Sequence, residues 1–242
     1  MFLPRNYALT ICLTAAVAMP VARANNIVLD FSNTNNPNGV WSYYYGTSST
    51  TQTEYTSSQG GTPIASLPSW YNGGGVPDAI YMVQNTTGST VNYLTISDPT
   101  GTLWLDPEEY SVAVVFTAPA AGTYNIEGDF LGIDTGENSH PVEILLDGTA
   151  IYSNTISSYG EDDSFNFSKS LNAGDTLSFY VGTGSAGCSY CNLSTGLDGT
   201  VTAAAVGAVP EPSLVWLCAG VFLSLLATHL VRRMPFRSRD SD

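Results

Sequence analysis

Short apolar and aromatic runs with a period of two recur along the middle of the chain. From Thr123 to Phe130, for example, Tyr124, Ile126 and Phe130 alternate with polar residues such as Asn125 and Glu127. Successive side chains of a β-strand point to opposite faces, so this pattern predicts strands with one packed face and one solvated face. Residues 25–209 show no helical period of useful length. The pattern therefore predicts an all-β domain.

The predicted strands are separated by Gly, Asn, Pro and Asp. They cover residues 27–31, 40–45, 79–84, 110–117, 123–133, 142–146, 150–156, 164–170, 176–182 and 197–204. Asp147-Gly148 is the clearest turn, because this pair readily adopts the positive φ angles of a type I′ hairpin. Segment 48–75, rich in Ser, Thr and Gly, predicts a long loop or a loosely paired edge hairpin. The number and shortness of the strands predict a single jelly-roll-like β-sandwich.

The N-terminus has the pattern of a secretory signal peptide covering residues 1–24. Arg5 supplies a positive charge, residues 8–19 are apolar, and Ala22-Arg23-Ala24 is an A-x-A cleavage site. The alternative, an N-terminal membrane anchor, is less favoured because the apolar stretch ends at Pro20 and is too short to span a bilayer. We expect an exported domain that covers residues 25–206.

Residues 207–242 form a second targeting segment. The apolar run 213–231 is 19 residues long, about 28 Å as a helix, close to the roughly 30 Å hydrocarbon core of a bilayer. Arg232 and Arg233 begin the basic tail 232–242. The positive-inside rule therefore predicts one transmembrane helix with a cytoplasmic C-terminus, at least transiently.

Val209-Pro210-Glu211-Pro212, the apolar run and the basic tail follow one another in this order. Together they resemble the PEP-CTERM sorting signal of Gram-negative bacteria. This resemblance implies Pro210, Glu211 and Pro212 as the sorting motif and an exosortase-type membrane protease as a partner. It also implies passage through the inner membrane to the cell surface or extracellular matrix.

The exported domain is strongly acidic. Residues 25–209 hold 18 Asp and Glu residues against the single basic residue Lys169. Nucleic acid, phosphorylated ligands and anionic membrane surfaces require clustered cations, so the charge argues against them as partners. Neutral sugars and divalent cations remain compatible, and solubility in an extracellular matrix explains the acidity equally well.

Several turn and core segments are similar to a β-sandwich module frequent in exported PEP-CTERM proteins. They are Asn36-Pro37-Asn38-Gly39-Val40-Trp41, Phe116 to Tyr124, Leu171 to Asp175, and Ser194-Thr195-Gly196-Leu197. That module in turn resembles carbohydrate-binding modules and galactose-binding-like jelly rolls. The resemblance implies a structural calcium ion near the first and last strands, where Asp30 and Asp198 stand.

Aromatic residues are the candidate sugar contacts, because exposed rings stack on sugar faces. Trp70 and Tyr71 lie beside Asn72-Gly73 in a Gly/Pro-rich segment that is hard to bury, so they are the preferred pair. Trp41 is a third candidate. The alternation of Trp41, Tyr43 and Tyr45 along a predicted strand is equally consistent with core packing.

Two cysteines and one histidine of the exported domain could carry chemistry. Cys188 and Cys191 favour a local disulfide in an oxidising compartment. A redox pair would require a helix N-terminus and a zinc site would require more ligands, so both are less favoured. His140 lies near Gly136 and Pro141 and reads as a solvated loop residue.

Carboxylates offer the one enzymatic alternative, a carbohydrate-active hydrolase that uses two acids in a cleft. Glu108-Glu109, Asp134 with Glu137, and residues 161–163 are the candidate sources. All lie in predicted turns, which favours solvated charges. The sequence therefore predicts a non-catalytic surface or matrix protein associated with exopolysaccharide, with a hydrolase or a purely structural matrix protein as alternatives.

Overall fold

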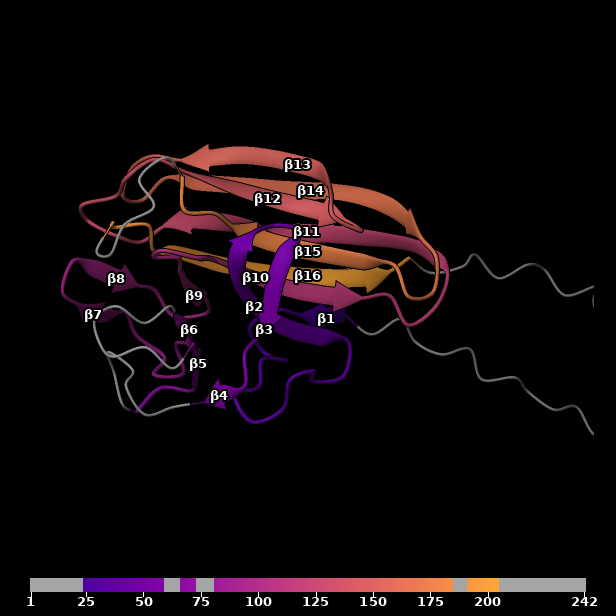
Figure 1. Ribbon diagram of the computed structural model, residues 1–242, viewed down its shortest axis with the longest axis horizontal. Coiled ribbons are helices and arrows are strands. Elements are labelled where there is room, and N and C mark those ends of the chain that lie inside the picture. The colour runs from indigo at the N-terminus through magenta and orange to yellow at the C-terminus, as the bar shows by residue number, and fades with distance from the viewer. Residues whose placement is uncertain (1–23, 59–65, 73–80, 185–190, 205–242) are drawn as a thin grey trace, which may run out of the picture. The chain divides into compact units, whose positions relative to one another are not determined.

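The computed structural model describes residues 24–58, 66–72, 81–184 and 191–204. Regular structure in these residues is all β, with no helix, and it forms a two-layered sandwich (Figure 1). The predicted all-β sandwich is confirmed. Within the described part of the chain, no helix has the length and apolarity to cross a membrane. The predicted signal peptide up to residue 23 and the apolar run 213–231 lie outside the described residues.

The first sheet has eight antiparallel strands. Along its main path they are β14 (Asp162–Leu171), β11 (Gly122–Gly132), β16 (Thr195–Ala203), β9 (Leu103–Asp106), β6 (Tyr81–Gln84), β5 (Ser69–Tyr71) and β4 (Ser57–Ser58), and β1 (Ala24–Asn26) also pairs with β16. The long strands β11 and β14 pair over ten residue positions, from Gly122 to Leu131 of β11. Because β1 pairs with β16, the first and last strands of the described residues are neighbours.

The second sheet has six antiparallel strands. Their order is β13 (Thr149–Ile156), β12 (His140–Leu146), β15 (Thr176–Val181), β10 (Ser111–Thr117), β2 (Trp41–Ser48) and β3 (Thr51–Glu54). From β10 onward the chain crosses repeatedly between the sheets, as it does in jelly rolls. At one edge of the sandwich β13 meets β14, where the rings of Tyr152 and Phe165 have centroids 5.9 Å apart (Figure 1).

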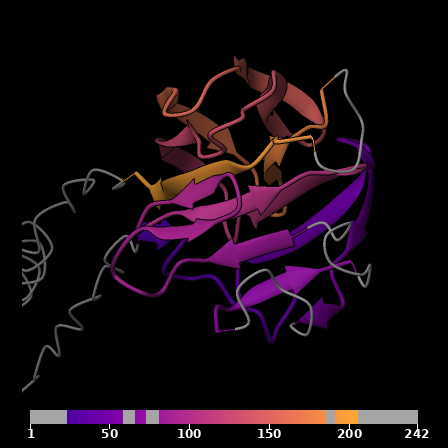
Figure 2. The same cartoon turned by 90° about the vertical axis from the view of Figure 1, so that its left-hand side faces the viewer.

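A separate hairpin, β7 (Val91–Tyr93) and β8 (Ile96–Asp98), lies at one end of the sandwich. It joins the residues after β11, because the Ser97 amide donates to the Ile133 carbonyl and the Thr135 amide to the Thr95 carbonyl, each at 2.8 Å. Figure 2 views the molecule from this end.

Aromatic side chains fill the space between the sheets. Phe116 of β10 meets Tyr124 of β11 with centroids 5.7 Å apart, and Phe165 of β14 meets Phe179 of β15 at 5.8 Å. Rings of this size bury roughly 150–250 Å² each and dominate core energetics. Where a strand alternates, as β11 does at Tyr124, Ile126 and Phe130, the period-two pattern marks the face that points into this core.

The turn chemistry explains both a success and a failure of the strand prediction. Asp147 and Gly148 have φ angles of 49° and 79°, as the predicted type I′ hairpin between β12 and β13 requires. The strand predicted over 27–31 is wrong, because Asn26 turns the chain there. Its Oδ1 accepts the amides of Val28 and Leu29 at 2.9 and 2.7 Å, which replaces a partner strand.

Candidate functional site

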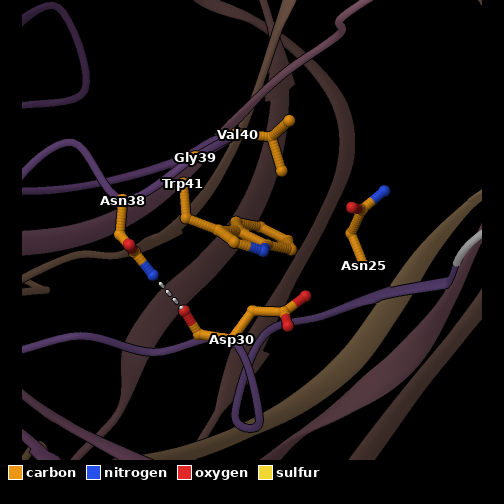
Figure 3. A pocket seen from close by; sticks show the side chains of 6 residues that line it. All are labelled: Asn25, Asp30, Asn38, Gly39, Val40 and Trp41. Atoms are coloured by element: carbon orange, nitrogen blue, oxygen red, sulfur yellow. Dashed lines mark hydrogen bonds between the residues drawn. The ribbon is translucent and has the colours of Figure 1, made fainter.

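A polar pocket lies between two turns that precede β2. It has a volume of about 260 Å³ and is lined by Asn25, Asp30, Asn38, Gly39, Val40 and Trp41 (Figure 3). One wall is the turn after β1, which carries Asp30. The other is the turn that leads into β2, where Gly39 has a φ of +62° and Asn38 and Trp41 exchange backbone hydrogen bonds. Glycine suits this position because an L side chain is strained there.

Hydrogen bonds connect the two turns and fix the residues around them. Asn38 Nδ2 donates to the Asp30 carbonyl at 2.9 Å, the bond drawn in Figure 3. The Asp30 carboxylate itself accepts the Asn26 amide through Oδ2 at 3.0 Å. The hydroxyl of Tyr43 accepts the Ser32 amide at 3.1 Å. Burial, with a smaller contribution from the charge of Asp30, raises the pKa of Tyr43 to about 12, so this phenol is neutral at physiological pH.

Trp41 forms the floor of the pocket and belongs to the core. Its side chain is 1 % exposed and packs edge-on against Phe116, with centroids 5.4 Å apart. Its indole Nε1 is buried and has no hydrogen-bond partner among the described residues. In Figure 3 the nitrogen-bearing edge of the indole is turned toward Asp30. A buried donor without a partner costs free energy, and an acceptor in the pocket relieves this cost only if the pocket-lining turns move enough to expose Nε1.

The expectation that Trp70 presents an exposed ring is wrong. Trp70 is 3 % exposed, its Nε1 donates to the Ser32 carbonyl at 2.6 Å, and its ring lies 6.2 Å from that of Tyr43. The segment that looked like an open loop forms β5, so both faces of the indole are covered. Tyr71 is half-buried against a second apolar cluster that contains Tyr81. The structure therefore does not offer Trp70 as an open stacking surface, and Tyr71 as a sugar contact stays a prediction.

Asp198, the second predicted calcium ligand, lies in the middle of β16 and faces Asp129 of β11 across the sheet. Its Oδ1 accepts the amide of Gly199 at 2.7 Å. Asp30 instead lines the pocket. Among the described residues, no group of three or more His, Cys, Asp or Glu side chains is arranged to hold a metal ion. The calcium site stays a prediction.

Three acids and a histidine that were expected to be solvated are buried instead. Glu108, Asp134 and His140 are 8, 2 and 1 % exposed, and the side chain of Glu137 has no exposed surface. The charges of Glu108, Asp134 and Glu137 interact with Asp106, which is also buried. We call Asp106, Glu108, Asp134, Glu137 and His140 the carboxyl cluster. The expectation failed because these turns fold onto residues 191–195, a contact that local sequence does not reveal.

The remaining predicted site residues lie outside the described residues. They are Ala22 of the signal cleavage site, Cys188 of the predicted disulfide, the motif Pro210, Glu211 and Pro212, and the flanking Arg232 and Arg233. Ala24 begins β1, and Cys191 is buried. The pairing of Cys188 with Cys191 stays a prediction.

Comparison with known proteins gives structural matches of low similarity. A family 35 carbohydrate binding module from an environmental isolate matches with a TM-score of 0.32 and 16 % identity, over 50 % of this chain and 90 % of that one. A family 35 carbohydrate binding module from Clostridium thermocellum gives 0.27 and 13 %, over 55 % and 86 %. Tandem CBM51 modules of a family 98 glycoside hydrolase from Streptococcus pneumoniae give 0.36 and 10 %, over 67 % and 48 %.

No protein-family model matches the chain, and no curated protein matches it. Because the structural scores are low, we take neither a fold nor a ligand for this chain from them. The pocket residues themselves carry the functional argument.

Proposed function

We propose that this protein is an exported, non-catalytic binder of neutral polysaccharide, sorted to the cell surface or extracellular matrix by its C-terminal segment. The observation that carries the binding proposal is the pocket with the unpartnered Trp41 Nε1. Asp30 provides acceptors, Asn25 and Asn38 are amides, and Trp41 provides a donor without a hydrogen-bond partner among the described residues. Sugar hydroxyls both donate and accept hydrogen bonds, so they match this mixed set.

The size and charge of the pocket restrict the class of ligand that it can bind. Its volume of about 260 Å³ is below the roughly 300–1,000 Å³ of pockets that enclose drug-sized ligands, so it suits one sugar unit or a chain end. The carboxylate of Asp30, in a domain with 18 acids and one Lys, disfavours anionic sugars. The proposed ligand is therefore a neutral glycan that presents a terminal or branching unit.

The binding test is a panel of neutral and acidic polysaccharides probed with the purified full chain and two variants. Trp41→Phe keeps an aromatic ring and removes the unpartnered donor. Trp70→Phe makes the same chemical change where the donor is bonded to Ser32. We expect wild type and Trp70→Phe to bind a neutral polysaccharide and Trp41→Phe to lose roughly 2- to 12-fold in affinity, since one hydrogen bond contributes roughly 0.5–1.5 kcal/mol.

Two results would contradict the binding proposal. If the wild type binds none of the polysaccharides, the binding proposal is wrong. If wild type and Trp41→Phe bind with equal affinity, the ligand does not use the pocket at Trp41. Far-UV circular dichroism of both variants provides the folding control. A release of reducing sugar during the assay would support the hydrolase alternative instead.

The sorting part of the proposal rests on the sequence. Residues 1–24 and 207–242 support export and processing by an exosortase-like protease that recognises Pro210, Glu211 and Pro212. Mass spectrometry of the protein recovered from the cell surface tests it. We expect a mature chain that starts near Asn25 and ends close to the motif. Recovery of peptides that contain Arg232 and Arg233 from the surface protein would exclude removal of the C-terminal segment.

A further inference from the structure

The carboxyl cluster joins three separate parts of the chain at one end of the sandwich. Asp106 ends β9 and Glu108 follows it. Asp134 and Glu137 lie between β11 and β12, and His140 is the first residue of β12. Ser194 Oγ donates to Asp106 Oδ1 at 2.8 Å, and the amide of Cys191 lies 3.4 Å from Glu108 Oε2. Two buried acids thus hold the segment that leads into β16.

His140 and its neighbours also contact residues 191–195, the segment that leads into β16. His140 Nε2 lies 2.6 Å from Thr195 Oγ1, and His140 Nδ1 lies 2.9 Å from the Asn138 carbonyl. A carbonyl accepts only, so Nδ1 carries the proton and Nε2 accepts from Thr195 in the neutral ring. The amide of Asn138 also donates to the Asn192 carbonyl at 2.9 Å.

Glu137 is the least satisfied member of the carboxyl cluster. Its Oε2 accepts the Asp134 amide at 3.1 Å. Its Oε1 is buried without a hydrogen-bond partner among the described residues, 3.4 Å from Nδ1 of His140, whose proton is already directed to Asn138. An ionised carboxylate in this position would be an unpaired buried charge, which is costly.

Within the part of the chain that the structure describes, no Lys or Arg is close enough to neutralise Asp106 or Glu137. Lys169 is the one Lys or Arg of the described residues, and it pairs with Tyr124, eight positions along β11 from Gly132. Eight strand residues span roughly 27 Å, well beyond a Debye length of about 8 Å at physiological salt. The protonated, neutral form is therefore the one that the surroundings of these acids favour.

Burial and like charges raise the pKa values of two of these acids. Burial, and then the charges of Glu108 and Asp134, raise the pKa of Asp106 to about 7, and the hydrogen bond from Ser194 acts in the opposite direction. Burial, and then the charges of Asp134, Asp106 and Glu161, raise the pKa of Glu137 to about 8. The other ionisable neighbours are Tyr55 and Tyr81, whose pKa values are raised by burial and by the charge of Asp106. Burial lowers the pKa of His140.

We propose that the carboxyl cluster is a pH-sensitive clamp, which holds residues 191–195 against residues 134–140 when its acids are protonated and loosens when they ionise. The inference is independent of the sugar pocket, because the two sites share no residue. It predicts that this end of the sandwich opens as an exported protein moves from mildly acidic to mildly alkaline surroundings.

The sign of the effect follows from linkage. Asp106 and Glu137 bind protons more tightly in the folded state than in the unfolded chain, where their pKa values are about 3.9 and 4.3. Their stabilising contribution is complete below about pH 4 and is lost as the pH rises through about 7 to 8. His140 acts in the opposite direction, because its lowered pKa adds stability above its ordinary value.

The experiment compares the full chain with the double variant Asp106→Asn, Glu137→Gln by hydrogen exchange at pH 5.5 and 8.5. The readout is the protection of the Asn138 amide, corrected for intrinsic exchange, with the Val114 amide in β10 as reference. We expect Asn138 protection in the wild type to fall by about tenfold or more relative to Val114, since one pKa unit corresponds to a factor of ten. The double variant should show little change.

The matched control is Glu54→Gln, Glu127→Gln, which removes the same charge from two exposed acids. It should retain the pH response of the wild type. If the double variant fails to fold, Glu137→Gln alone carries the test and should reduce the response by at least half. Equal protection of Asn138 at both pH values in the wild type, or parallel responses in wild type and variants, would overturn the proposal.

Discussion

Asp30 and Trp41 line one pocket from two different turns, and the amide of Asn38 in the second turn is bonded to the Asp30 carbonyl of the first at 2.9 Å. The two side chains are eleven positions apart in the sequence. A pocket built from turns that are anchored to each other is largely pre-formed. Pre-organisation of this kind lowers the entropic cost of binding a small ligand.

Asn36 should be essential for the arrangement of these turns. Its Nδ2 donates to the carbonyls of Tyr43 and Tyr55 at 2.7 and 3.0 Å, and its Oδ1 accepts the Tyr43 amide at 2.9 Å. Asn36→Ala leaves three backbone groups without this partner, so we expect a loss of about 2–4 kcal/mol in the free energy of unfolding.

Urea denaturation measures the loss for Asn36→Ala. Asn35→Ala is the matched control, because Asn35 is exposed and its contact with Ser32 is made by its backbone amide. It should stay within about 0.5 kcal/mol of the wild type. Similar losses for the two variants would show that the side-chain bonds of Asn36 do not hold the turn.

Trp70 should behave as a core residue and not as a ligand contact. Trp70→Ala removes a buried ring beside Tyr43, so we expect a loss of about 3–5 kcal/mol. Trp70→Phe should cost about 1–3 kcal/mol, because the Ser32 carbonyl loses its donor. Thermal unfolding followed by circular dichroism checks both values. A Trp70→Ala variant of unchanged stability would contradict the buried position.

Asp129 should destabilise the outer face of the first sheet at neutral pH. Burial, and then the charges of Asp162 and Asp198, raise its pKa to about 6. The folded protein therefore holds the proton of Asp129 more tightly than the unfolded chain does. This contribution to the free energy of unfolding is lost as the pH rises from about 4 through 6. Asp129→Asn should therefore match the wild type near pH 4 and exceed its stability at pH 7.5.

The expected gain for Asp129→Asn is modest, roughly 0.2–1 kcal/mol, because like charges that face each other across strands interact on this scale. Chemical denaturation at the two pH values measures it. Glu127→Gln is the control, since Glu127 lies on the same strand but faces the neutral Thr200. The explanation by charge repulsion fails if both variants gain equally, or if the gain of Asp129→Asn is the same at pH 4.

Part of the fold could be predicted from the sequence because the longer strands have a recognisable pattern or composition. The period-two pattern located β11, and runs rich in β-branched and aromatic residues located β10 and β13, each to within about two residues. β9 was missed because its buried run is only four residues long and has no alternation to detect. The features of the sequence that could have indicated β9 are the short apolar run itself and the flanking Gly101 and Pro107.

Less of the candidate site than of the fold could be predicted from the sequence. Trp41 and Asp30 were singled out for different reasons, as a sugar contact and as a calcium ligand, and their shared pocket depends on the geometry of two turns. Asn25 and Asn38 gave no local signal, since asparagine is common in every turn. The carboxyl cluster depends on contacts between residues far apart in the chain, such as Asp106 and Ser194, which a single sequence does not reveal.

Gly128 should tolerate no side chain, because β11 and β16 approach closely at this point. Gly128 is paired with Gly199, and a Cβ atom on Gly128 would clash with the Asp198 carbonyl oxygen and lie 2.6 Å from the Gly199 Cα. Both are backbone atoms in the middle of a sheet, so they can move only by distorting the pairing. We expect Gly128→Ala to cost about 3 kcal/mol or more, the upper range of overpacking effects.

The control for Gly128→Ala is Gly122→Ala at the start of the same strand, where an added Cβ meets no atom within 4 Å. Since alanine loses less backbone entropy than glycine on folding, Gly122→Ala should be neutral or stabilising by up to about 1 kcal/mol. Differential scanning calorimetry of both variants gives the comparison. A Gly128→Ala protein as stable as Gly122→Ala would show that β11 and β16 are spaced more widely than the structure places them.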